Sequence, residues 1–99
     1  MLVEGGNPAW CHPILWRRVE AHRAANPGVK IIIVDPRVTD SCSIADLHLQ
    51  INPGTDITLN HAIGRLLIEN GDIDIDFINN HADGFEQYSK LVFKTSLNK

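Results

Sequence analysis

The run Ile31-Ile32-Ile33-Val34-Asp35-Pro36-Arg37 constrains the fold of this chain more than any other stretch. Four consecutive β-branched aliphatic residues are typical of a strand that is buried on both faces, as in parallel sheets. The run ends on a carboxylate, and proline then removes a backbone donor from the pairing. Because ligands bind beyond the carboxyl ends of strands in open α/β sheets, Asp35 occupies the position at which a sugar or nucleotide hydroxyl is bound.

Length and composition limit the classes of protein to which the chain can belong. Its 99 residues correspond to one small domain, 1–99, and 43% of them are hydrophobic, which is ordinary for a globular protein. A net charge of -3 argues against a nucleic-acid partner, because neutralising phosphates requires a basic surface. No apolar run reaches the roughly 18 residues that span a bilayer, so no membrane partner is expected. Cys11 and Cys42 lack metal-type spacing, and without a signal-peptide pattern they favour a reduced, cytoplasmic setting.

Hydrophobic periodicity and turn residues predict strands that alternate with helices. The expected elements are, in order, a strand at 1–4, a helix at 13–26, the buried strand at 30–34, a helical turn near 41–45, a strand at 47–51, and helices at about 55–70, 72–80 and 84–91. In the first helix we expect Leu15, Val19 and His22 to share the inward face and Arg23 to point outward. Residues 93–99 have no clear period and are expected to fray.

This order implies a small Rossmann-like α/β domain with three layers, α/β/α, in which about three parallel strands have flanking helices. Three strands lie close to the lower limit for independent stability. The first strand is short and carries Glu4. We therefore expect the chain to be a fragment of a larger protein.

Three loops are expected at the carboxyl edge of this sheet, and each suits part of a nucleotide. The first, 5–9, is rich in glycine and precedes a helix, whose N–H groups favour a diphosphate. An ordinary strand-to-helix turn is the alternative. In the second loop, the Asp35 carboxylate can accept both hydroxyls of a ribose, and Arg37 can bind a phosphate. The alternative is that Asp35 caps the turn before Pro36.

The third loop, Pro53-Gly54-Thr55-Asp56, places a carboxylate at the start of a helix. Guanine presents two adjacent donors, its ring N–H and its amine, and a carboxylate accepts both. The alternative is a helix cap formed by Thr55 or Asp56. Taken together, the loops predict a nucleotide site.

Other residues that could carry chemistry are set aside. Cys11, His12, Cys42 and His48 do not suit zinc, because adjacent ligands rarely fit one tetrahedron. Trp10 and Trp16 are expected to pack in the core or at an interface and not against a cofactor. Asp72, Asp74 and Asp76 lack the glycine and glutamate of a calcium loop and indicate a solvated helix start. We expect no catalytic residue and no metal ligand in this chain.

With these loops identified, the chain resembles the molybdopterin oxidoreductases of the dimethyl-sulfoxide-reductase superfamily over nearly its whole length. The stretches that carry the resemblance are 5–13, 34–39, 44–46, 53–56 and 70–85. The segment Asn7-Pro8-Ala9-Trp10-Cys11-His12-Pro13 is most similar to the assimilatory nitrate reductases, with formate dehydrogenases and periplasmic nitrate reductases as the nearest alternatives.

The resemblance implies a domain that holds one guanosine arm of a bis-molybdopterin guanine dinucleotide cofactor. It assigns the pyrophosphate and pterin to Gly5, Gly6 and Asn7. It assigns the ribose and nearby groups to Asp35, Pro36, Arg37 and Thr39. It assigns the guanine to Gly54, Thr55 and Asp56, with Asp56 as the bidentate partner. The family usually has serine where Gly6 stands, so a hydroxyl contact is missing here.

The resemblance also implies that the reacting centre lies outside this chain. The family's iron–sulfur cysteines and its molybdenum ligand lie upstream, and Cys11 is neither of them. The parent protein is expected to reduce nitrate to nitrite, with its remaining domains and an electron donor (ferredoxin, flavodoxin or an NADH-linked subunit) as partners. The isolated chain is expected to be inactive. The alternatives are a formate dehydrogenase fragment, a stand-alone nucleotide-binding or regulatory module, and an interaction domain.

Overall fold

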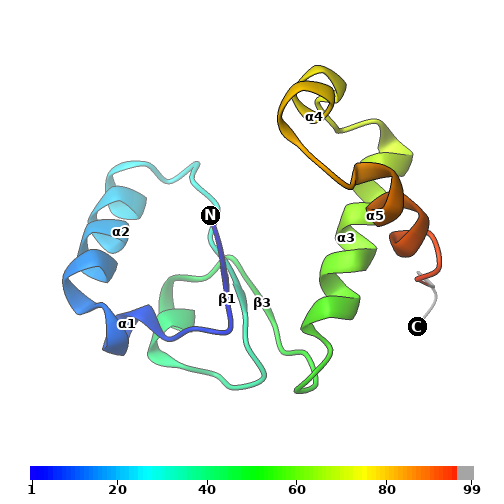
Figure 1. Ribbon diagram of the computed structural model, residues 1–99. Helices are drawn as coiled ribbons and strands as arrows, with labels where there is room; N and C mark the ends of the chain where they lie inside the picture. Colours follow the sequence, from blue (N-terminus) through cyan, green and yellow to red (C-terminus); the bar gives the residue numbers. More distant parts are fainter. Residues whose placement is uncertain (96–99) are drawn as a thin grey trace. The chain divides into compact units, whose positions relative to one another are not determined.

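A computed structural model describes residues 1–95 of the chain, and residues 96–99 of the predicted frayed tail lie outside the described residues. Within the range predicted as one domain there are two compact units, Met1–Pro53 and Gly54–Lys99. The first unit contains strands β1 (Leu2–Glu4), β2 (Ile32–Val34) and β3 (Leu47–Leu49), helices α1 (Pro8–Cys11) and α2 (Pro13–Ala25), and the 3-10 helix η1 (Asp40–Ile44) (Figure 1). The second unit contains α3 (Asp56–Asn70), α4 (Ile75–His81) and α5 (Phe85–Val92).

The three strands form one parallel sheet in the order β1-β2-β3. Ile32 pairs with Leu2 on one side and with Leu47 on the other, and the rest of β2 follows the same register. The central position of β2 explains its unbroken aliphatic run, because both of its edges and most of its side chains are covered. The sheet and its flanking helices confirm the predicted small α/β fold.

The strands are shorter than the sequence predicts, with three residues each. The first predicted residues of β2 lie outside the three-residue strand but still form hydrogen bonds to the segments on both sides of it. The carbonyl of Lys30 accepts the N-terminal ammonium of Met1 at 2.6 Å, and the N–H of Ile31 donates to the Asp46 carboxylate at 2.8 Å. The N–H of Ile32 also donates to the Met1 carbonyl at 2.9 Å, and the Ile31 carbonyl accepts the N–H of Leu47 at 3.3 Å, so pairing bonds reach beyond the three-residue strands.

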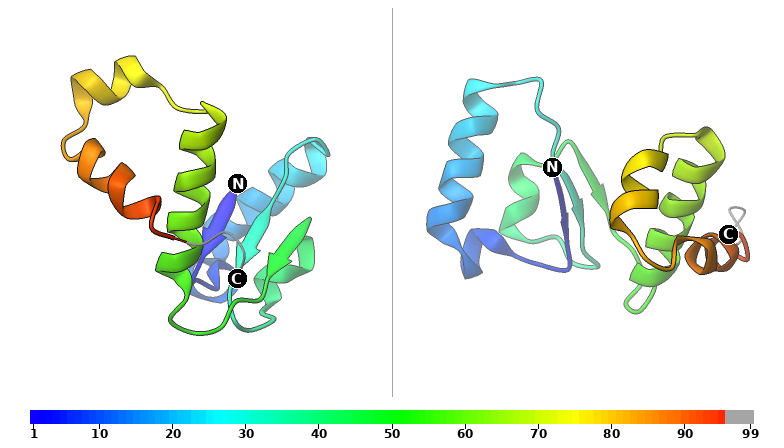
Figure 2. Two further views of the ribbon diagram at one scale, coloured as in Figure 1. Left: turned by 90° about the vertical axis from the view of Figure 1, so that its right-hand side faces the viewer. Right: turned by 45° about the horizontal axis from the view of Figure 1, so that its top comes forward.

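The core of the first unit lies on one face of the sheet. Trp16, Ile31 and Ile33 are buried together, and residues of α2 and η1 pack against them, among them Val19 and Ile44. Figures 1 and 2 show α2 and η1 on the same side of the three strands. These elements account for one helical layer, and the second layer of the predicted α/β/α arrangement stays a prediction.

The inward face of α2 differs from the prediction. Trp16 is 3% exposed, whereas Leu15 is 55% exposed and His22 also lies at the surface. Arg23, predicted to point outward, is half-buried and forms an ion pair. The helix is turned because the indole of Trp16 fills more of the space over Ile31 and Ile33 than a leucine can.

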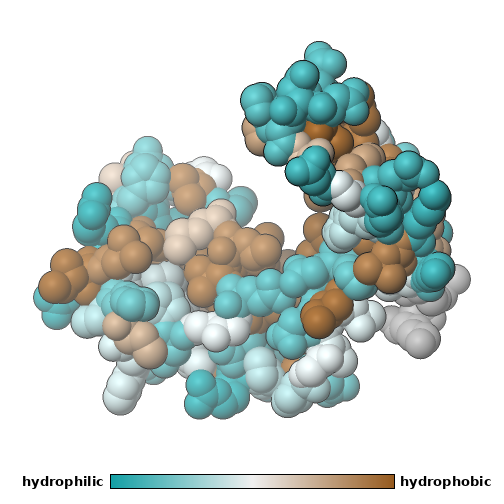
Figure 3. Space-filling model, viewed as in Figure 1, coloured by the Kyte–Doolittle hydropathy of each residue, from teal (hydrophilic) through white to brown (hydrophobic). Residues whose placement is uncertain are grey.

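An apolar groove borders the core between α2 and the amino ends of β1 and β2. Met1, Leu15, Val19 and Val29 are among the residues that line this groove, whose volume is about 720 Å³. Figure 3 shows hydrophobic side chains at the surface along α2 and beside the N-terminus. The groove is separate from the carboxyl edge of the sheet, because Met1 lies at the opposite end of β1 from that edge.

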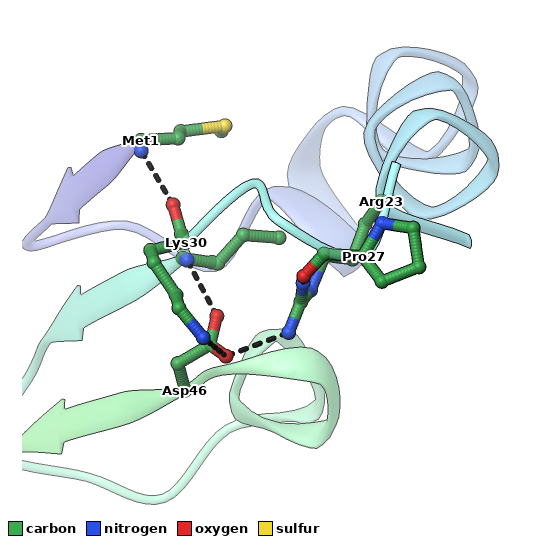
Figure 4. Close-up of polar contacts among 6 residues, drawn as sticks. Met1, Arg23, Pro27, Lys30 and Asp46 are labelled. Atoms are coloured by element: carbon green, nitrogen blue, oxygen red, sulfur yellow. Dashed lines mark hydrogen bonds and ion pairs between the residues drawn. The ribbon is translucent and has the colours of Figure 1, made fainter. Parts of the chain in front are cut away.

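Asp46, just before β3, ties the amino ends of β2 and β3 to the last turns of α2 (Figure 4). Its Oδ2 accepts the N–H of Ile31 at 2.8 Å, while its Oδ1 lies 2.6 Å from an Arg23 nitrogen and 3.4 Å from Lys30 Nζ. The hydrogen bond from Ile31 is the largest cause that lowers the pKa of Asp46 below its ordinary value. The two cations act in the same direction, and desolvation opposes them.

Asp46→Asn is expected to lower the midpoint of thermal unfolding at neutral pH and to flatten the loss of stability in acid. The pKa of Asp46 is lower in the folded state than in the unfolded state. Its carboxylate therefore contributes stability that is complete above the unfolded-state pKa of about 3.9 and is lost as the pH falls through the folded-state pKa. Circular dichroism melts over a series of acidic and neutral buffers measure this dependence.

Asp40→Asn provides the control for that experiment. Asp40 is exposed, and its carboxylate accepts a hydrogen bond from the neutral indole of Trp10. This variant is expected to lower the thermal midpoint at neutral pH less than Asp46→Asn, because it removes one exposed hydrogen bond and keeps the contacts of Ile31, Arg23 and Lys30. An unchanged pH profile in Asp46→Asn would contradict the role of Asp46.

The second unit confirms the three predicted helices. Gly71, in the left-handed conformation, ends α3, and the Asp74 side chain caps α4 by accepting the N–H of Phe77 at 2.8 Å. The aspartates after α3 therefore begin a helix, as predicted. Arg65 of α3 donates to the carbonyl of Thr95 at 2.7 Å, so residues just after α5 are hydrogen-bonded to α3. Among the helices of residues 1–95, none has the length and apolar content needed to cross a membrane.

Candidate functional site

The carboxyl ends of β1 and β2 place the first two predicted loops at one edge of the sheet. The last residues of the strands are in register. Beyond them, the N–H of Gly5 donates to the carbonyl of Val34 at 2.9 Å, and the N–H of Asp35 donates to the carbonyl of Leu49 at 3.2 Å. These bonds extend the ladder by one residue and fix where each loop leaves the sheet. The loops therefore begin side by side.

The backbone of the first loop is open to a ligand at Gly6. Gly5 has a φ of +63°, a left-handed conformation that favours glycine. Gly6 does not share this conformation, and a Cβ added to it would meet nothing nearer than the Glu4 carbonyl oxygen at 4.0 Å. The two glycines thus serve different purposes, a turn at Gly5 and free space at Gly6.

A helix N-terminus does not supply the first loop's donors, contrary to the prediction. The loop leads into the four-residue α1, which is too short for an appreciable dipole. The N–H groups in its first turn bond within the chain, from Ala9 to Ser41 Oγ and from Trp10 and Cys11 to the Asn7 carbonyl. The donors that remain as candidates for a ligand are the backbone N–H groups of Gly6 and Asn7 and the Asn7 amide.

Ser41 joins the first loop to the segment that follows the second. Its side chain is fully buried, and its Oγ accepts the Ala9 N–H at 3.0 Å and donates to Asn7 Oδ1 at 2.8 Å. The indole N–H of Trp10 also donates to Asp40, the first residue of η1. Sequence reasoning missed Ser41, because nothing in the local pattern separates it from the exposed Ser43 two residues later.

Asp35 is buried and caps its own loop. Its Oδ1 accepts the N–H of Arg37 at 2.7 Å and lies 3.9 Å from the Arg37 Nε. Asp35 therefore caps the turn at Pro36, which was the alternative to a ribose-binding role. A carboxylate has about four acceptor sites on its two oxygens, so this bond leaves sites on Asp35 for a ribose hydroxyl, and the ribose contact stays a prediction.

Two side chains, one in β3 and one directly after it, hydrogen-bond to the backbone of the second loop. The ring nitrogen Nε2 of His48 lies 2.9 Å from the carbonyl oxygen of Asp35, and Gln50 Nε2 donates to the carbonyl of Pro36 at 2.9 Å. Because a carbonyl only accepts, His48 carries its proton on Nε2 here. The sequence predicts no role for His48 once zinc binding is set aside, whereas its place in β3 makes it a support for the loop.

The remaining residues predicted in the second loop differ in their availability to a ligand. The Arg37 side chain is 77% exposed and can extend toward an anion. Thr39 lies at the start of η1, where its hydroxyl is 3.8 Å from the Cys42 thiol and its carbonyl accepts the Cys42 N–H. Arg37 is therefore the charged group that this loop offers.

The third predicted loop begins at Pro53, the last residue of the first unit, and its other three residues belong to the second unit. Gly54 has a φ of +84°, so the turn requires glycine, and Thr55 occupies the N-cap position of α3. Asp56 is the first residue of the helix itself. Of the two residues that the alternative named as a cap, Thr55 and not Asp56 stands at the N-cap position, and its side chain forms no cap hydrogen bond. Its position relative to the first two loops stays a prediction.

The cysteines do not add a metal site. Cys11 and Cys42 are both free thiols. Within residues 1–95, no group of three or more His, Cys, Asp or Glu side chains is placed to hold a metal ion.

Comparisons with known proteins agree on one family. The family model for molybdopterin oxidoreductase matches residues 1–89. The chain is 52% identical over 88 residues to the nitrate reductase of Synechocystis sp., covering 89% of this chain and 12% of the relative. It is 39% identical over 92 residues to formate dehydrogenase H of Escherichia coli, covering 93% of this chain and 13% of the relative. Acetylene hydratase from Pelobacter acetylenicus matches in structure with a TM-score of 0.77 and 28% identity, over 98% of this chain and 13% of that one.

These matches cover the loops at the sheet edge as well as the strands between them. The chain spans a small part of each relative, about an eighth of the Synechocystis protein and of formate dehydrogenase H. The family model extends over both units and ends only in α5. The chain belongs to the molybdopterin oxidoreductase family.

Proposed function

We propose that this chain is part of the cofactor-binding domain of a molybdenum-dependent nitrate reductase and holds one guanosine arm of bis-molybdopterin guanine dinucleotide. The observation that carries the proposal is the pair of loops that begin side by side at the carboxyl edge of a parallel sheet, in a chain 52% identical to a nitrate reductase. The lower identity to formate dehydrogenase H, 39%, makes a formate dehydrogenase the second candidate.

The chemistry of the two loops suits an anionic nucleotide. The backbone approaches freely at Gly6, Asn7 adds backbone and side-chain donors, and Arg37 supplies an exposed positive charge. These groups would bind the pyrophosphate, with Gly5 shaping the turn. Asp35, Pro36 and Thr39 would line the ribose, and Gly54, Thr55 and Asp56 would receive the guanine.

In this proposal the chain binds the cofactor and does not carry out the reaction. When bound, the molybdenum centre supplies the oxygen transfer that converts nitrate to nitrite. The parent protein is then an oxidoreductase that acts in the cytoplasm, with an iron–sulfur cluster in another part of it. Its electron donor is a ferredoxin, a flavodoxin or an NADH-linked subunit, and the isolated chain is inactive.

Titration of the 99-residue chain with GDP, GMP and ADP tests the guanine assignment. We expect weak binding, because one domain supplies part of the contacts that enclose the cofactor. Binding should favour GDP over ADP, and Asp56→Ala should remove a preference of about tenfold, since a bidentate bond to a carboxylate contributes about 1.5–3 kcal/mol. Asp76→Ala, which removes another aspartate from a first helical turn, is the control. An equal or stronger response to ADP would exclude a guanine site.

Gly6→Ser is expected to strengthen binding of the diphosphate by about two- to tenfold, because it adds the hydroxyl donor that the family usually has at this position. The added Cβ has room, so the free energy of unfolding should stay within about 0.5 kcal/mol of the wild type. Gly5→Ser is the matched control. Its left-handed φ of +63° should cost about 1–2 kcal/mol of stability. GDP titration and urea unfolding measure both effects, and weaker binding in Gly6→Ser would count against a phosphate at this loop.

A further inference from the structure

We propose that Ser41 is a positioning residue of the candidate site, whose buried hydroxyl turns the Asn7 carboxamide so that the first loop presents an amide donor to its ligand. Ser41 lies on η1, 34 residues from Asn7 in the sequence, and does not itself reach a ligand. The identity of the ligand as a diphosphate rests on the proposed function. The orientation of Asn7 rests on the hydrogen bonds alone.

The hydrogen bonds of Ser41 leave one orientation of Asn7. The Ser41 hydroxyl oxygen accepts the backbone N–H of Ala9 at 3.0 Å, so its single proton must find a separate acceptor. Asn7 Oδ1 lies at 2.8 Å and provides that acceptor. If the carboxamide were flipped, Nδ2 would face Ser41 Oγ and a fully buried hydroxyl proton would have no acceptor there.

This orientation decides which ligands the Asn7 side chain can bind. Because Oδ1 is engaged with Ser41, a ligand meets the amide group Nδ2, which only donates hydrogen bonds. The diphosphate of a dinucleotide has no proton on its oxygens at neutral pH, so these oxygens only accept hydrogen bonds. The loop thus presents Nδ2 beside the backbone N–H groups of Gly6 and Asn7, and all of these groups select for an anion with acceptor oxygens.

Ser41 also couples the two loops of the site. It is part of η1, which follows the loop of Asp35 and Arg37, yet its bonds go to Asn7 and Ala9 of the other loop. A change at Ser41 is therefore expected to alter the first loop without touching the exposed Arg37. This predicts a weaker diphosphate contact with an unchanged base contact.

The test compares Ser41→Ala, Ser41→Thr and the control Ser43→Ala in the 99-residue chain. Ser43 is exposed on the same 3-10 helix. Two readouts are used, the side-chain amide resonances of Asn7 by NMR and titration with inorganic pyrophosphate, with guanosine as a phosphate-free probe. Ser41→Ala should shift the Asn7 amide signals and weaken pyrophosphate binding by about tenfold while guanosine binding is unchanged, since one charge-assisted hydrogen bond is lost. Ser41→Thr keeps the hydroxyl and should restore both readouts.

Asn7→Asp keeps the test decisive if Ser41→Ala fails to fold. The aspartate retains an oxygen that faces Ser41, replaces the amide donor by an acceptor and adds a negative charge, so the proposal requires that the fold is kept and pyrophosphate binding is lost. Asn7→Ala removes the donor without adding charge and must weaken pyrophosphate binding as well. Retained binding in Asn7→Asp, or unshifted Asn7 signals in a folded Ser41→Ala, overturns the role of Ser41. If the wild type binds neither pyrophosphate nor GDP, the proposed function fails, and the Asn7 resonances still decide the role of Ser41.

Discussion

Replacing Trp16 by alanine is expected to lower the free energy of unfolding of the first unit by about 3–5 kcal/mol, the range for removing a large aromatic side chain from a core. Trp16 is 3% exposed and packs with Ile31 and Ile33, the centre of the only buried cluster formed by the sheet and α2 within residues 1–95. Domains are commonly stable by about 5–15 kcal/mol, so this loss is a large part of the total. Urea unfolding followed by the fluorescence of the remaining Trp10 measures it.

Trp10→Ala is the matched control for Trp16→Ala. Trp10 is 72% exposed, and its indole N–H donates to Asp40, so its removal should cost about 1 kcal/mol or less. Trp16→Phe adds a second comparison. The buried indole N–H of Trp16 has no hydrogen-bond partner among the described residues. Phenylalanine removes that unsatisfied donor and should retain most of the stability. Equal unfolding midpoints for Trp10→Ala and Trp16→Ala would disprove the assignment of the core.

Ile33→Ala is expected to destabilise the first unit by about 2–5 kcal/mol, because it opens a cavity in the centre of the sheet. Ile33 is fully buried and pairs with Val3 of β1 and His48 of β3. Its side chain lies on the face that α2 and η1 cover. Chemical unfolding monitored by circular dichroism gives the loss of free energy.

Its neighbour Ile32 supplies the control. Ile32 has the same side chain on the same strand but points to the opposite face, and it is only partly buried. Ile32→Ala should therefore cost clearly less than Ile33→Ala. If the two substitutions cost the same, the division of β2 into a covered face and a less covered face would be wrong.

Much of the fold could be predicted because its signals are local. The aliphatic run before Asp35 predicts a strand buried on both faces, since four β-branched residues in succession are typical of such a strand, and the structure places it at the centre of the sheet. Pro13 and Gly71 marked the start of α2 and the end of α3, because proline suits a first turn and glycine adopts the left-handed cap. Parallel pairing then followed from the alternation of strands and helices.

The rest depended on contacts between distant residues. The first turns of α2 carry Ile14, Leu15 and Trp16 in succession, so the apolar residues surround the helix and do not define one face. Packing against the sheet selected Trp16. The bonds from Ser41 to Asn7 and from Asp46 to Arg23 join residues more than twenty positions apart, which no local pattern can reveal.

For the third loop, too, the local sequence predicts the residue types, whereas their positions at the helix start come from the structure. The composition of the third loop could be read from the sequence, and the structure then placed Thr55, not Asp56, at the N-cap. The contact of Asp56 with a base stays a prediction, and the titration with GDP and ADP tests it.

The register of the sheet also predicts an order of assembly. Pairing Leu2 with Ile32 closes a loop about twice as long as pairing Ile32 with Leu47. Each doubling of loop length adds about 0.6 kcal/mol of closure entropy, so β2 and β3 are expected to pair first and β1 to join last. Because Gly5 hydrogen-bonds to Val34 only when β1 is in place, the first loop of the candidate site forms in the final step of folding.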